Sequence, residues 1–154
     1  SNGVEFDFTS MITDNWTLSG AASFLESELV EDYRRSASSP EPDAPAGSRL
    51  PRVPEVKWNV STRYTFANDW FAQAAYMYTG DSYNDLFGGF RQLQGSYDVV
   101  NASFGLERSN WTAELYVQNL TDERGDVWIN DVNWDERVTI NQPRTIGFRW
   151  QQRF

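Results

Sequence analysis

The chain has 154 residues, no cysteine, no histidine and a formal net charge of −9 at pH 7. These facts exclude a disulfide framework, a thiolate or histidine metal site and a Ser-His-Asp triad. An acidic chain also lacks the basic surface that binds phosphates, so no nucleic-acid partner is expected. No run of about 18 apolar residues occurs, and the sequence therefore predicts no transmembrane helix.

Seven stretches alternate apolar and polar residues with the period of two that is typical of β-strands. The clearest begins Val56-Lys57-Trp58-Asn59-Val60. Many of the stretches have about ten residues, which suits a tilted crossing of a membrane, whereas strands of soluble proteins average about 5 to 6 residues. In chain order, the predicted strands cover residues 4–12, 16–26, 56–66, 70–79, 97–107, 111–118 and 145–154.

Short and long connections alternate between these predicted strands. Each of three tight turns leads directly into a tryptophan, namely Trp16, Trp70 and Trp111, whereas the other connections are long and polar. Transmembrane β-barrels have short turns on one side, long loops on the other and aromatic girdles at both membrane interfaces. We therefore expect these three tryptophans to lie at a membrane interface.

Charged residues fall on the polar faces of the predicted strands. A lysine or arginine on the lipid-facing side near the membrane midplane costs roughly 2 to 4 kcal/mol. The apolar faces carry only Glu26 and Asp98, both at the margin next to the long loops. This segregation predicts an all-β, antiparallel, up-and-down transmembrane β-barrel. A soluble sandwich with one packed and one solvated face would alternate in the same way and remains an alternative.

The last predicted strand resembles the C-terminal assembly signal of bacterial outer-membrane barrels. It ends in Phe154, with Phe148 and Trp150 at alternate positions before it, although Gln152 stands where the family usually has an apolar residue. Residues 115–122, LYVQNLTD, resemble the penultimate strand and the corner of TonB-dependent receptors. Residues 3–20 and residues 50–58 are similar to an earlier hairpin and a loop-to-strand entry of the same receptors, so the resemblance covers nearly the whole chain.

This resemblance implies a 22-stranded barrel filled by an N-terminal plug. Residues 1–154 would be its last seven strands, without the plug and its TonB box. Seven strands do not close a single-chain bacterial barrel, and open edges are not tolerated in hydrocarbon, so we expect a fragment of a longer protein. The implied location is the bacterial outer membrane, and the implied function is TonB-dependent uptake of a siderophore or another scarce nutrient.

The resemblance also implies partners and site residues. The partners would be outer-membrane lipid, the missing barrel strands and plug, the TonB complex and the barrel-assembly machinery. Charges on the lumen side would contact the plug, and the candidates are Lys57, Arg63, Glu114, Arg149 and Arg153. Residues of the outer loops would contact the ligand, and the candidates are Tyr83, Phe87, Arg91, Trp128 and Trp134.

No catalysis, cofactor or metal site is predicted. Residues 131–135 resemble the start of a calcium loop, but Glu136 and Gln142 stand where such a loop needs glycine and a bidentate glutamate. Two other functions remain possible from the sequence: a small passive outer-membrane barrel and a soluble, carbohydrate-binding β-sandwich. The sequence does not identify a transported substrate.

Overall fold

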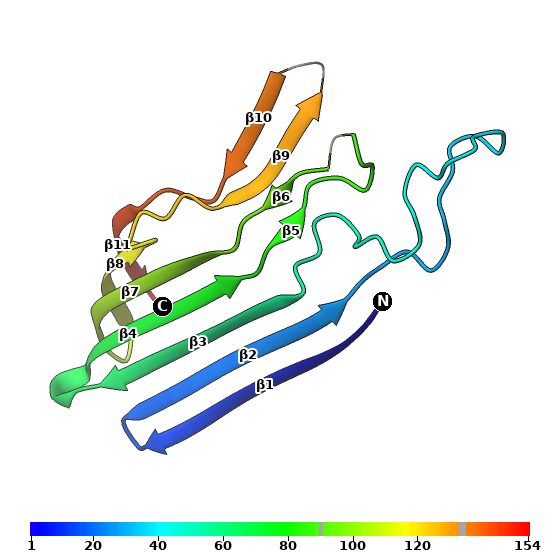
Figure 1. Cartoon of the computed structure of the whole chain (residues 1–154). Helices are drawn as coiled ribbons and strands as arrows, with labels where there is room; N and C mark the ends of the chain where they lie inside the picture. The colour runs from blue at the N-terminus through cyan, green and yellow to red at the C-terminus, as the bar shows by residue number, and fades with distance from the viewer. Residues whose placement is uncertain (90, 133–134) are drawn as a thin grey trace.

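The main element of the computed structural model is a seven-stranded antiparallel sheet (Figure 1). The structure describes residues 1–89, 91–132 and 135–154, and side chains outside residues 131–136. The strands of the sheet, in spatial order, are β1 (Asn2–Thr13), β2 (Trp16–Glu26), β3 (Val56–Thr65), β4 (Trp70–Thr79), β7 (Tyr97–Glu107), β8 (Trp111–Gln118) and β11 (Thr145–Gln152). Spatial order follows chain order, as in an up-and-down barrel wall, so the predicted all-β antiparallel fold is confirmed.

The strand ends differ from the predicted ones by one or two residues, since β1 is longer than 4–12 while β3 and β11 stop before residues 66 and 154. The long connections also hold short strands that the alternation did not predict. They are β5 (Ser82–Tyr83), β6 (Leu93–Gln94), β9 (Asp126–Val132) and β10 (Asp135–Ile140). β5 pairs with β6, and β9 pairs with β10. The two hairpins extend beyond the main sheet on the side opposite the tight turns (Figure 1).

The strand register keeps one face of the main sheet apolar from edge to edge. Directly paired residues point to the same face, so a row of partners can be followed across the strands. One row on the apolar face consists of Thr13, Trp16, Tyr64, Ala72, Phe104, Leu115 and Phe148. The adjacent row on the other face consists of Met11, Thr17, Arg63, Gln73, Ser103, Tyr116 and Gly147. A slip of one residue would exchange the faces, so this contrast specifies the register.

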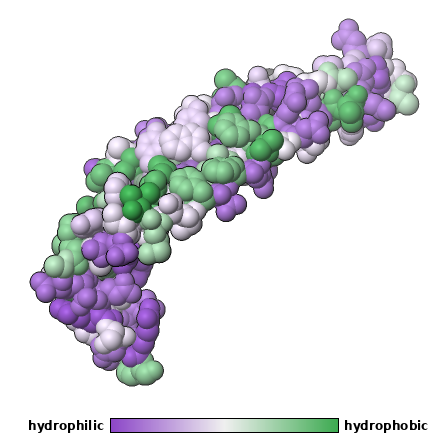
Figure 2. Space-filling model, turned by 90° about the horizontal axis from the view of Figure 1, so that it is seen from below, coloured by the Kyte–Doolittle hydropathy of each residue, from purple (hydrophilic) through white to green (hydrophobic). Residues whose placement is uncertain are grey.

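No described part of the chain covers the apolar face. Phe104 is 48% exposed, Phe148 61% and Trp150 53%. Among the described residues, the buried apolar side chains are only Ala44, Phe71 and Ile129. In Figure 2 the molecule is a curved, elongated body whose hydrophobic residues are most frequent along the middle of the arc. A β-sandwich would bury one face of each sheet against the other, so this arrangement argues against the soluble alternative.

One group of aromatic side chains lies at the end of the apolar face next to the tight turns. Trp70 stacks on Phe104 with ring centroids 5.0 Å apart, and Trp111 stacks on Trp150 at 4.7 Å. Trp16, which follows the first tight turn, is 40% exposed. Such pairs contribute about 0.5 to 1.5 kcal/mol beyond the area that they bury. The three tryptophans expected at an interface therefore share one end of the sheet.

A second aromatic group lies at the opposite end of the apolar face. Trp58 stacks on Tyr76 with centroids 5.0 Å apart and on Tyr78 at 5.9 Å. A strand of ten residues rises about 33 Å, and a tilt of about 40° reduces this to about 25 Å, the height of the apolar band in outer-membrane barrels. Among the described residues, no helix is long and apolar enough to cross a membrane.

Candidate functional site

The polar face of the main sheet carries ion pairs that run from strand to strand. Arg63 of β3 reaches across β4 to Glu107 of β7, with 2.6 Å between its Nη2 and the carboxylate Oε2. Its guanidinium also lies 3.8 Å from the centroid of the Phe71 ring. Arg149 of β11 pairs with Glu114 of β8 at 2.7 Å. Three of the five predicted lumen charges are thus paired within the wall, where partly exposed pairs contribute little to stability.

The other two predicted lumen charges form no ion pair with a described residue. Lys57 lines a groove on the polar face together with Glu5 and Asp7 of β1. Arg153 follows the last residue of β11 and is exposed, and its backbone N–H donates to the carbonyl oxygen of Asn110 at 2.8 Å. The contact of these two cations with a plug therefore stays a prediction.

Buried amide side chains join the two outer hairpins. Asn84 is 5% exposed, and its Nδ2 donates to the carbonyl oxygen of Ile129 in β9 at 3.2 Å. Gln94 is 1% exposed, and its Nε2 lies 3.4 Å from the carbonyl oxygen of Asp126. Both contacts run from the β5–β6 hairpin to the β9–β10 hairpin. These hydrogen bonds therefore hold the two hairpins together beyond the long-loop end of the main sheet (Figure 1).

Arginines surround the aromatic candidates in the outer loops. The guanidinium carbon of Arg91 lies 3.7 Å from the centroid of the Tyr83 ring, and that of Arg49 lies 5.4 Å from it. Arg52 donates its backbone N–H to the carbonyl oxygen of Tyr83 at 2.8 Å, and its guanidinium lies 5.0 Å from the Trp128 ring. A guanidinium over an aromatic face is attracted by the ring quadrupole. Tyr83 is thus the centre of an arginine cluster.

The remaining ligand candidates are not all part of this cluster. Phe87 lies under the guanidinium of Arg35 at 3.8 Å and packs near Tyr33 with centroids 5.8 Å apart. Trp134 lies outside the described residues, as do the side chains of the calcium-like segment 131–136. Arg35, Arg49 and Arg52 were not among the ligand contacts predicted from the sequence. Their signal was the presence of arginines beside aromatic residues in long loops of an acidic chain.

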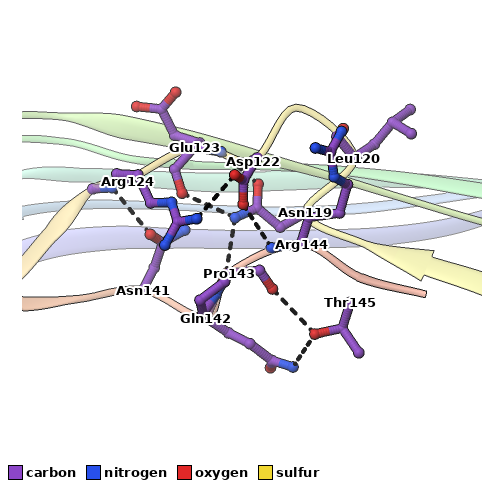
Figure 3. A network of polar contacts seen from close by, with 11 residues as sticks. Asn119, Leu120, Asp122, Glu123, Arg124, Asn141, Gln142, Pro143, Arg144 and Thr145 are labelled. Carbon is purple, nitrogen blue, oxygen red and sulfur yellow. Dashed lines mark hydrogen bonds and ion pairs between the residues drawn. The ribbon is translucent and has the colours of Figure 1, made fainter. Parts of the chain in front are cut away.

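A buried asparagine organises the corner between β8 and the outer hairpin β9–β10 (Figure 3). Asn119 is 1% exposed and has a left-handed backbone with φ 52°. Its Nδ2 donates to the carbonyl oxygens of Glu123 at 2.9 Å and Gln142 at 2.8 Å, and its Oδ1 accepts the Glu123 N–H at 2.9 Å. Its backbone N–H donates to Oδ1 of Asn101 in β7 at 2.9 Å. One residue therefore connects β7, β8 and the segment that enters β11.

Asp122 completes this corner. Its Oδ1 accepts the backbone N–H of Arg144 at 2.9 Å, and its Oδ2 pairs with the guanidinium of Arg124 at 2.9 Å. The Arg144 N–H, and after it the Arg124 side chain, holds the pKa of the Asp122 carboxyl below its ordinary value. Hydrogen bonds to the charged form have this effect because they favour the carboxylate. The corner thus prefers an ionised Asp122.

This lowered pKa predicts a loss of stability in acid. A depressed pKa in the folded state contributes stability that is complete above the unfolded value of about 3.9 and disappears as pH falls through the folded value. We expect acidification from pH 7 to about pH 3 to lower the urea midpoint of the folded protein more than that of Asp122→Asn, which cannot titrate at this position. Equal acid sensitivity of the two proteins would contradict a contribution from this carboxylate.

Residues 1–120 match the family model described as TonB dependent receptor-like, beta-barrel. The chain belongs to this family. The motif LYVQNLTD, through which the sequence resembles such receptors, builds the corner around Asn119 and Asp122.

Solved receptor structures have the same fold. The siderophore receptor PiuA from Acinetobacter baumannii matches 96% of this chain at 22% identity with a TM-score of 0.78, and the match covers 21% of that chain. The ferric-catecholate import receptor Fiu from E. coli K12 matches 96% of this chain at 22% identity with a TM-score of 0.71, and the match covers 20% of that chain. The ferric yersiniabactin uptake receptor FyuA from Yersinia pestis matches 96% of this chain at 18% identity with a TM-score of 0.73, and the match covers 22% of that chain. The chain spans about a fifth of the length of these receptors.

A glycine of the receptor wall is required by the packing of Phe71. Phe71 is 2% exposed, and a Cβ on Gly105 would lie 2.7 Å from its ring and 2.5 Å from the carbonyl oxygen of Ala113. We expect Gly105→Ala to destabilise the complete receptor by about 1 to 3 kcal/mol through overpacking, measured as a lower denaturant midpoint in detergent. Gly88→Ala is the matched control, because no atom of a described residue lies within 4 Å of the added Cβ. Equal midpoints for the two variants would contradict this packing.

Proposed function

We propose that this chain is the C-terminal wall of a bacterial outer-membrane receptor that takes up an iron–siderophore complex with energy from the TonB complex. Membership of the receptor family and similarity to three iron-uptake receptors support the proposal. The observation that carries it is a sheet whose apolar face is continuous over seven strands and is covered by no described residue, while its other face is polar. Such a sheet suits a wall between lipid and a lumen.

The candidate residues take separate roles in this proposal. The whole receptor would be a 22-stranded barrel around a plug, and Lys57 and Arg153 would contact the plug because they have no ion-pair partner among the described residues. Trp16, Trp70 and Trp111 would lie at the periplasmic membrane interface, where aromatic girdles anchor barrels. The barrel-assembly machinery would read the last strand through its exposed aromatic residues, namely Phe148, Trp150 and Phe154.

The outer loops would meet the substrate before it enters the barrel. The described candidates there are Tyr83, Phe87, Arg91 and Trp128, of which Trp128 is 39% exposed. A receptor of this kind binds and moves its substrate and performs no catalysis on it. The lumen pairs Arg63–Glu107 and Arg149–Glu114 would keep the wall locally neutral along the substrate path.

Uptake of radioactive iron tests the proposal. The complete receptor would be expressed in a bacterial strain without its own siderophore receptors, and matched cells would lack TonB. We expect accumulation of iron from at least one siderophore complex in cells with TonB and none above background in cells without it. Accumulation that does not depend on TonB would instead identify a passive barrel and overturn the proposed function.

A further inference from the structure

We propose that the apolar face of the sheet contains a binding groove for one acyl chain of a phospholipid from the leaflet next to the tight turns. The groove crosses β2, β3 and β4, reaches β7 and has a volume of about 330 Å³. This volume falls in the range of small-molecule sites, about 300 to 1,000 Å³. The inference concerns lipid and not the transported substrate, and it rests on the proposed placement of this face in the membrane.

A small residue between two large aromatic residues gives the groove its depth. Ala74 of β4 is part of its lining, and so are Trp16 and Tyr76. The register places Trp16 level with Ala72, so along β4 the groove passes from the level of Trp16, over Ala74, to Tyr76. The alanine methyl group leaves a depression between the two rings. Methylene groups that fill such a depression gain van der Waals contacts with its walls.

The two aromatic walls of the groove are held by contacts within the sheet. Trp16 donates its Nε1–H to Oγ1 of Thr62 at 2.7 Å. Trp16 pairs with Tyr64, so Thr62 lies two residues further from the tight turn on the neighbouring strand, and the indole leans toward the membrane interior. At the other end, Tyr76 stacks on Trp58 with ring centroids 5.0 Å apart. The groove is therefore formed before a lipid binds.

The lining of the groove suits a hydrocarbon chain. Among the described residues, no charged side chain lines it. Thr62 contributes a hydroxyl group, but this hydroxyl already accepts the indole N–H of Trp16. A polar ligand group would lose its hydration here without gaining new partners, and that loss is costly. The apolar face continues on both sides of the groove, so the occupant is part of the lipid that covers this face.

The position of the groove selects the leaflet. β4 begins at Trp70 beside a tight turn, and Tyr76 lies six residues further along the strand. Six residues rise about 20 Å, which a tilt of about 40° reduces to about 15 Å along the membrane normal. The apolar band of such barrels is about 25 Å tall, so the groove occupies the half next to the tight turns. Because short turns of outer-membrane barrels face the periplasm, the occupant is a phospholipid of the periplasmic leaflet.

The test counts the phospholipids that bind to the purified receptor. The complete receptor is stripped of lipid in nonionic detergent, at the same detergent concentration in every sample. Dipalmitoyl phosphatidylethanolamine is then added in steps, and native mass spectrometry follows the complexes. We expect the first phospholipid to bind at least about tenfold more tightly than any further one, because only the first occupies the groove.

Variants assign the tight binding to this groove. We expect Ala74→Leu to weaken binding of the first phospholipid about tenfold, because the larger side chain fills the groove. Ala102→Leu is the matched control, since Ala102 pairs with Ala74 on the same face but is not part of the lining. This control should bind like the wild type. Thr62→Val removes the acceptor of the Trp16 N–H with little change of shape, and we expect a smaller loss of affinity than in Ala74→Leu.

Several results would overturn the inference. They are the absence of a preferred first phospholipid, and equal affinities of Ala74→Leu and Ala102→Leu. Displacement of the phospholipid by lipopolysaccharide would assign the groove to the other leaflet, and a receptor dimer without bound lipid would assign it to a second copy. If Ala74→Leu does not fold, Thr62→Val and Ala102→Leu decide, because only the former should bind more weakly than the wild type. Uptake of iron is measured separately, so each of these results leaves the proposed function standing.

Discussion

Replacement of Ala74 with arginine is expected to destabilise the complete receptor in lipid by roughly 2 to 4 kcal/mol, whereas the same replacement at Ala75 is expected to have little effect. Ala74 lies in the middle of β4, where it pairs with Ala102 of β7 on the apolar face. Ala75 pairs with Asn101 on the polar face. The difference arises because only the arginine at position 74 would lie in hydrocarbon near the membrane midplane.

The two alanines are a closely matched pair. They are adjacent in one strand and both receive the same arginine side chain, so differences in β-propensity largely cancel between the variants. The measurement is the denaturant midpoint of each receptor folded into lipid vesicles, with the fraction of heat-modifiable band on gels as a second readout. Equal losses at both positions would contradict the assignment of the apolar face to lipid, and a larger loss at Ala75 would reverse it.

The main sheet was predictable from the sequence because side chains of a strand alternate with a period of two. Val56, Trp58 and Val60 therefore lie on one face in the structure, as the alternation predicted, and their register partners Phe24 and Tyr78 lie on the same face. Long strands repeat this signal many times. A short turn also fixes the register of the strands on both sides of it.

The outer hairpins were not predictable in the same way. β5 and β6 have two residues each, which is too short to show a period. The pairing of β9 with β10 has a register shift between Thr139 and Ile140, and such an irregularity breaks the alternation. These hairpins are held by buried side chains such as Asn84 and Gln94, whose acceptors are backbone atoms 32 or more residues away. No local pattern encodes such contacts.

The candidate site was predictable only as a set of residue types. The alternation predicts which charged residues share the polar face of the sheet, but it does not predict which of them is the ion-pair partner of Arg63. Glu107 is 44 residues away and two strands across the sheet, so the pair depends on the whole register. In the same way, the resemblance to receptors drew attention to Asn119 but did not predict its structural role. That role depends on a hydrogen bond to the carbonyl oxygen of Gln142, which lies 23 residues away in the sequence.

Removal of the Asn119 side chain is the second change with a large expected effect. Asn119→Ala deletes three hydrogen bonds and leaves the N–H and carbonyl of Glu123 and the carbonyl of Gln142 without their partner. Buried polar groups without partners cost about 1 to 3 kcal/mol, and a non-glycine residue in the left-handed region adds strain. We expect Asn119→Ala to lower the free energy of unfolding by about 2 to 4 kcal/mol. The measurement is the shift of the urea midpoint of the complete receptor in detergent.

Asn68 separates the two causes of this loss. It also has a left-handed backbone, with φ 62°, but it lies in the exposed turn Ala67–Asp69 and its side chain makes no hydrogen bond to a described residue. Asn68→Ala should therefore cost only the backbone strain, about 1 kcal/mol. Asn119→Gly removes that strain at the corner, so any loss that remains there belongs to the carboxamide. If Asn119→Ala and Asn68→Ala lower the midpoint equally, the buried hydrogen bonds contribute nothing.

The hydrogen bonds of this corner also predict which part of the receptor unfolds first. Asn119 and Asp122 attach the beginning and the end of the β8–β11 connection to each other, so their loss frees the β9–β10 hairpin before it frees the main sheet. In Asn119→Ala, limited proteolysis should therefore cut between β9 and β10 at low denaturant concentrations, at which the barrel still migrates on gels as the folded, heat-modifiable species. Asn68→Ala, whose turn lies at the opposite end of the sheet, should be cut there no faster than the wild type (Figure 1). Simultaneous cleavage and unfolding would instead mean that the corner and the wall form a single cooperative unit.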